Sequence, residues 1–130
     1  MADDSFDIVN KAKDLMKHTY KMTGNKDRYP SKYIMLIQDM QKICMQIRHC
    51  IRFANKTPLQ NNSEERLKMQ SDVITLCDEL SDDVEMSLEF NLIGSDVSKA
   101  WQKKISDVKY MVISWRESDK RRLKFLNKKS

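Results

Sequence analysis

The chain has 130 residues and carries 24 lysines and arginines against 19 acids, a net charge of +5. Only two glycines and two prolines are present, too few for the many turns of a β-sandwich or barrel, and no apolar run is long enough to span a membrane. These features predict one soluble, mainly helical domain over residues 1–130.

Two helices are predicted in the first half of the chain, over about residues 4–23 and 31–56. In both, apolar residues recur at every third or fourth position, the spacing that gives a helix one apolar side. Gly24 follows the first helix and can adopt the left-handed conformation that ends many helices. Pro30 suits the start of the second helix, and Pro58 lies just beyond its end.

Two more helices are predicted in the second half, over about residues 63–93 and 96–125. Ser63 is a good N-cap for the third helix, and Gly94 is expected to end it. The fourth helix leads into a basic C-terminal tail, whose distal part within residues 118–130 is expected to fray. Four long helices with short loops predict an all-α fold, an antiparallel up-down-up-down four-helix bundle.

Residues 110–115 are apolar on nearly all sides. A strand is one possibility, but the helical spacing on both sides favours a helix that is buried on more than one face. In a small bundle the extra face must meet another subunit. We therefore expect Tyr110, Ile113 and Trp115 to form an oligomer contact, and Trp101 to be buried within the bundle. Further apolar residues lie outside the main stripes of the second and third helices, which predicts exposed apolar surface in the monomer and so oligomerisation: Met35, Met45, Phe53, Phe90, Leu92 and Ile93.

Charge is segregated along the chain. Residues 58–95 carry nine acids and two bases, whereas residues 96–130 carry eleven bases and four acids. Adjacent helices of opposite sign offer one surface to polyanions and another to basic partners. This pattern favours binding over catalysis.

Little in the sequence suggests an enzyme. His18 and His49 lack the helical partners of a di-metal bundle, the acids around Asp82 lack the loop of a calcium site, and the glycines cannot build a phosphate loop. We therefore expect no metal, no cofactor and no catalytic activity. The three cysteines form no Cys-x-x-Cys pair and the N-terminus is acidic, so reduced thiols in a cytoplasmic protein are expected.

Basic residues are the better candidates for a site, because cations spaced one helical turn apart can each neutralise a phosphate. Six residues of the second and fourth helices are predicted to form a nucleic-acid-binding surface: Arg48, Arg52, Lys56, Lys99, Lys103 and Lys104. No aromatic platform is expected among them, so binding should not depend on base sequence. Alternatively, these charges form an ordinary solvated face or pair with the acidic third helix of a neighbouring subunit.

Several segments resemble a known family. The stretch Arg28-Tyr29-Pro30-Ser31-Lys32-Tyr33 follows Tyr20-Lys21-Met22-Thr23 and precedes Ile43, Ile47 and Ala54-Asn55. This order is similar to the first hairpin of the prokaryotic four-helix bundle family. That family includes ribosomal-RNA intervening-sequence proteins and the accessory variability determinant (Avd) of diversity-generating retroelements. Residues 109–116 resemble the last helix of the Avd branch, and Lys56-Thr57-Pro58 also favours that branch.

The resemblance implies a pentameric ring of four-helix bundles. It further implies a non-catalytic partner of the retroelement reverse transcriptase, which binds RNA or DNA through a basic surface and supports mutagenic copying of a template RNA. It assigns no role to an individual residue. The alternative function is a structural or protein-interaction bundle that has no contact with nucleic acid.

Overall fold

The structure is a computed structural model that describes residues 2–129, with side chains described from residue 7 to residue 128. Its elements are α1 (Ala2–Thr23), the short 3-10 helix η1 (Ser31–Tyr33), α2 (Ile34–Lys56), α3 (Ser63–Glu89) and α4 (Ser95–Lys129). Between residues 2 and 129 there is no strand, so the all-helical prediction is confirmed and the strand alternative for residues 110–115 is wrong. None of these helices holds an apolar stretch that could cross a lipid bilayer.

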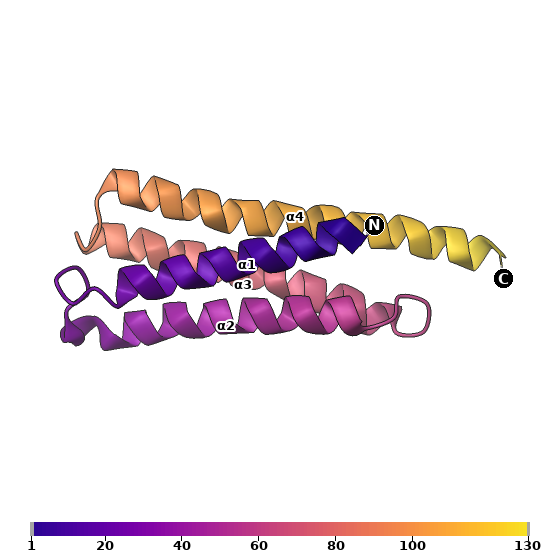
Figure 1. Ribbon diagram of the computed structural model, residues 1–130, viewed down its shortest axis with the longest axis horizontal. Helices are drawn as coiled ribbons and strands as arrows, with labels where there is room; N and C mark the ends of the chain where they lie inside the picture. Colours follow the sequence, from indigo (N-terminus) through magenta and orange to yellow (C-terminus); the bar gives the residue numbers. More distant parts are fainter. Residues whose placement is uncertain (1, 130) are drawn as a thin grey trace.

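The four helices pack side by side as a bundle (Figure 1). Among the described residues α1 packs against α2 and α4, and α3 also packs against α2 and α4. Two pairs, α1 with α3 and α2 with α4, are therefore diagonal and do not meet. Successive helices turn back at alternate ends of the bundle, and the last turns of α4 extend beyond the other three (Figure 1).

The core follows from the spacing of apolar residues, because positions three and four apart lie on one side of a helix. Trp101 is fully buried, and its Nε1 donates a hydrogen bond to Oγ1 of Thr19 on α1 (3.2 Å). Gln41 of α2 donates from Nε2 to Oγ1 of Thr23 (3.0 Å), which fixes α2 against the end of α1. Both tryptophans are largely buried, as predicted, and Trp115 is 8% exposed.

The end of α3 differs from the prediction. The helix stops at Glu89, four residues earlier than expected, and Asn91 rather than Gly94 takes the left-handed conformation (φ 61°). The backbone N–H of Leu92 donates to the carbonyl of Ser87 (2.9 Å), which satisfies one of the last free carbonyls of the helix. Asparagine tolerates this conformation, so the turn needs no glycine. Ile93, which was expected to be surface-exposed, is buried by this turn.

The end of α4 also differs, because the helix continues to Lys129 and residues 118–129 lie within it. The helix therefore continues past the predicted end near residue 125, and fraying of the tail stays a prediction. The first turn of this segment is anchored by Asp119, whose buried carboxylate accepts hydrogen bonds from Nε of Arg66 (2.7 Å) and Nε2 of Gln70 (2.7 Å). Arg66 also donates from Nη1 to the carbonyl of Thr57 (3.0 Å). We call Arg66, Gln70 and Asp119 the α3–α4 clamp.

Candidate nucleic-acid interface

Arg48 lies beside α1 and not beside the basic residues of α4. Together with Lys13, Met16, Lys17 and Tyr20 it lines a hollow of about 230 Å³ between α1 and α2. The three cations surround an apolar floor that Met16 and Tyr20 supply. The structure therefore joins a predicted site residue to two lysines that the charge pattern of the sequence did not single out.

The lysines of α1 form the centre of a basic surface. Lys13, Lys17 and Lys21 follow one another at intervals of four residues, on the side of α1 opposite the buried Ile8 and Leu15. None of the three forms an ion pair with another described residue. They are exposed and free to meet a phosphate.

Lys104 reaches the same surface from the other side of α1. The His18 imidazole is partly buried, and burial lowers its pKa, with smaller contributions from the charges of Lys104 and Lys21. Both lysines therefore lie close enough to affect one imidazole. We define the basic face as Lys13, Lys17 and Lys21 of α1, Arg48 of α2 and Lys104 of α4. The exposed residues of α1 also include one acid, Asp14.

Arg52 and Lys56 continue the basic face along α2. They follow Arg48 at intervals of four residues, and both are exposed. With His49 and Phe53 they line a second hollow of about 190 Å³. The three predicted residues of α2 thus lie on one stripe, as the sequence spacing implied.

The two predicted groups do not touch directly. Arg52 and Lys56 lie at the end of α2, whereas Lys99 and Lys103 lie at the start of α4, on a diagonal helix and at the other end of the bundle (Figure 1). Lys103 also forms an exposed ion pair with Asp107 (3.2 Å), which partly neutralises it. Both α1 and α3 lie between α2 and α4, but α3 is acidic, so the lysines of α1 are needed for a continuous basic surface.

Acidic residues collect on the diagonal helix α3. It holds nine acids and two bases, and α3 makes no contact with α1 in the described part of the chain. Two of these acids form ion pairs within the described part of the chain: Asp78 with Lys109 of α4 (2.7 Å) and Asp72 with Lys68 of α3 itself (3.0 Å). Charge is therefore segregated across the bundle as well as along the sequence.

Asp83 of α3 faces Asp39 of α2. Burial, the neighbouring Asp39 carboxyl and the charges of Asp82 and Glu79 raise the pKa of Asp83 from 3.8 to about 7. Because the folded pKa is the higher one, folding favours the protonated acid. This contribution to stability is present at low pH and is lost as pH rises through about 7.

We therefore expect Asp83→Asn to raise the melting temperature at pH 8, because the amide keeps the shape of the side chain but cannot become charged. The gain should shrink toward pH 5, where Asp83 is already protonated. Thermal melts at the two pH values measure it, with Glu85→Gln, at an exposed acid of the same helix, as the matched control. An equal gain at pH 5 and pH 8 would contradict this electrostatic explanation.

The three predicted oligomer-contact residues are not equivalent. Tyr110 is 62% exposed and Ile113 is partly exposed, so both are available at the surface of α4. Trp115 is 8% exposed, because the chain covers it and the Arg66 guanidinium lies 5.2 Å from its ring centre. Most of the Trp115 side chain is therefore covered within the chain, and its place at or near a subunit contact stays a prediction.

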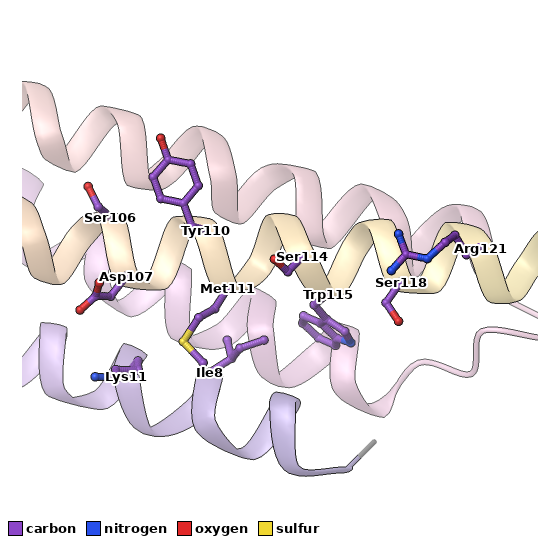
Figure 2. Close-up of a pocket in the computed structure, with 10 residues that line it drawn as sticks. All are labelled: Ile8, Lys11, Ser106, Asp107, Tyr110, Met111, Ser114, Trp115, Ser118 and Arg121. Carbon is purple, nitrogen blue, oxygen red and sulfur yellow. The ribbon is translucent and has the colours of Figure 1, made fainter.

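A larger groove, of about 660 Å³, separates α1 from α4. Ile8, Met111 and Trp115 point into the space between the two helices, whereas Tyr110 points away from α1 (Figure 2). Lys11 and Arg121 add positive charge to its lining. The groove combines apolar and basic groups and borders the surface that Tyr110 exposes.

The buried cysteines play no visible part in a site. Burial raises the pKa of the Cys44 thiol to about 11 and that of Cys77 to about 12. Thiols in this state are poor nucleophiles at neutral pH. They pack in the core as small apolar side chains, as expected.

Sequence reasoning missed Lys13, Lys17 and Lys21 because α1 also carries acids, which hide the lysines in a count of net charge. The four-residue interval between them was a usable signal. It also missed that Tyr20 and Phe53 lie among the cations, because tyrosine at helical spacing was assigned to the core and phenylalanine to an oligomer surface.

Comparisons with protein-family models, with curated proteins and with solved structures gave no match.

Proposed function

We propose that this protein is a non-catalytic accessory protein of a diversity-generating retroelement, similar to Avd, that binds the reverse transcriptase and its template RNA or DNA. The observation that carries the nucleic-acid part is the basic face on α1, continued by Arg52 and Lys56, whose cations have no ion-pair partner among the described residues. The retroelement setting is supported by the resemblance of residues 20–33 to the first hairpin of the prokaryotic four-helix bundle family and of residues 109–116 to the last helix of its Avd branch.

The proposal includes assembly of the up-down-up-down bundle into a ring, most simply a pentamer as in Avd. Supporting it, Tyr110 and Ile113 present apolar surface on α4, next to the groove of about 660 Å³. A bundle that exposes such surface gains free energy by covering it. The second candidate function, a purely structural or protein-interaction bundle, is favoured by this same apolar surface.

Salt dependence of nucleic-acid binding tests the proposal. Affinity for a single strand should fall with salt at a log–log slope of about −0.7 per neutralised phosphate. Arg52→Ala/Lys56→Ala should therefore flatten the slope by about 1.4. The control is Lys68→Ala/Lys120→Ala, which removes two cations already paired with Asp72 and Glu117 and should change the slope less.

Light scattering on the same samples reports the assembly state. We expect a mass several times that of the 15.4 kDa chain, unchanged in the Arg52→Ala/Lys56→Ala variant. A monomer across the micromolar range would rule out the ring. Loss of assembly in this variant, together with no salt-sensitive binding by the unmodified protein, would favour the structural alternative.

A further inference from the structure

Two exposed aromatic side chains lie among the cations of the proposed nucleic-acid surface. Tyr20 is 36% exposed and borders the hollow that Lys13, Lys17 and Arg48 surround. Phe53 is 61% exposed and borders the hollow that it shares with Arg52 and Lys56. Each hollow therefore combines cations with one aromatic ring, the first between α1 and α2 and the second on α2 alone.

The sizes of the hollows limit what can enter them. Drug-sized ligands occupy clefts of about 300–1,000 Å³. The Tyr20 hollow, of about 230 Å³, and the Phe53 hollow, of about 190 Å³, suit something smaller, such as one planar ring system. Arg48 and Arg52 are one helical turn apart, about 6 Å along the helix. A chain of small planar groups joined by anions would match both features.

We propose that Tyr20 and Phe53 are stacking platforms for the bases of a single-stranded polynucleotide, whose phosphates contact Lys13, Lys17, Arg48, Arg52 and Lys56. This inference rests on the proposed nucleic-acid function and specifies its substrate. Aromatic side chains in a positively charged groove are the usual means of holding single strands, because every base has a face that can stack.

A duplex does not fit this arrangement. Its bases are already stacked inside the helix, so an aromatic ring set between cations would meet only the backbone. Single strands offer unstacked bases and phosphates together. Stacking discriminates little between bases, so the prediction of sequence-independent binding is retained, although the aromatic rings themselves were not expected.

Binding of two labelled oligodeoxynucleotides of equal length, oligo(dT) and a fully abasic strand, tests the inference by fluorescence anisotropy. Both carry the same phosphates, but only the first has bases to stack. Tyr20→Leu and Phe53→Leu should each weaken oligo(dT) binding by about tenfold and leave abasic-strand binding unchanged. Tyr20→Phe keeps the ring and should bind like the unmodified protein. Phe90→Leu, at an exposed aromatic residue beyond the end of acidic α3, should change neither affinity.

The outcomes separate the two proposals. If the unmodified protein binds both strands but Tyr20→Leu and Phe53→Leu bind oligo(dT) normally, stacking is overturned and the basic face stands. If the unmodified protein binds neither strand, the proposed nucleic-acid function itself fails. An acidic protein then becomes the better candidate for the partner of the basic face. Equal affinity for a duplex and for oligo(dT), with no effect of either leucine variant, also overturns the inference.

Discussion

Trp101→Ala should destabilise the bundle by about 3–5 kcal/mol, the usual cost of removing a large buried aromatic side chain. Trp101 is the largest fully buried residue among those described, and it packs edge-on against His18 with the ring centres 5.5 Å apart. Its loss leaves a cavity between α1 and α4 and removes the hydrogen-bond donor of Thr19. Thermal or urea unfolding at neutral pH measures the change.

Two variants serve as controls for this result. Trp101→Phe keeps most of the apolar volume and loses the indole donor, so its cost should approach that of one hydrogen bond, about 1 kcal/mol, plus a smaller cavity. Tyr110→Ala, on the exposed side of the same helix, should change monomer stability little. An unchanged melting temperature in Trp101→Ala would mean that α4 does not turn this side chain into the core.

Asp119→Ala is expected to cost about 3–5 kcal/mol as well, because it removes one partner of a buried ion pair. The side chain of Asp119 is 1% exposed and that of Arg66 is 12% exposed. Without the carboxylate, the Arg66 guanidinium keeps only the Thr57 carbonyl and the Trp115 ring, and Gln70 loses its acceptor. Unfolding monitored by circular dichroism should show a melting temperature lower by more than about 10 °C.

Replacing the whole pair should be far less costly than breaking it. Arg66→Met/Asp119→Leu leaves no buried charge, and apolar replacements of buried ion pairs are often neutral or stabilising. The double variant should therefore recover most of the stability lost in Asp119→Ala. If both variants are equally unstable, the α3–α4 clamp acts through shape and not through charge.

The helices themselves could be predicted from the sequence because their apolar residues repeat with the helical period. Ile8, Leu15, Ile47 and Trp101 are buried for that reason. The end of α3 was predicted too late because asparagine is a weaker signal for the end of a helix than glycine is. Gly94 was therefore chosen as the end, although Asn91 takes the left-handed conformation. The burial of Asp119 in α4 was missed because nothing local marks it: its partners lie about fifty residues away in the sequence.

The candidate site was harder to predict than the fold. Spacing along α2 correctly placed Arg48, Arg52 and Lys56 on one stripe. Sequence alone does not reveal which helices are neighbours, so residues of the diagonal helices α2 and α4 were assigned to one surface. The role of α1 as the bridge between them, through Lys17 and its neighbours, follows only from the packing order of the bundle.

The concentration of acids on α3 has a consequence for motion in solution. This helix carries nine acids and two bases, whereas none of the other three helices has an excess of acids, so the bundle has an electric dipole directed across its long axis, away from α3. In the field of a polyanion this dipole produces a torque, which turns α1 toward the polyanion before the two molecules meet. Such electrostatic steering can raise association rates by about 10–10³-fold. The carboxylates of α3 thus favour productive encounters by repelling a polyanion from the wrong side of the bundle.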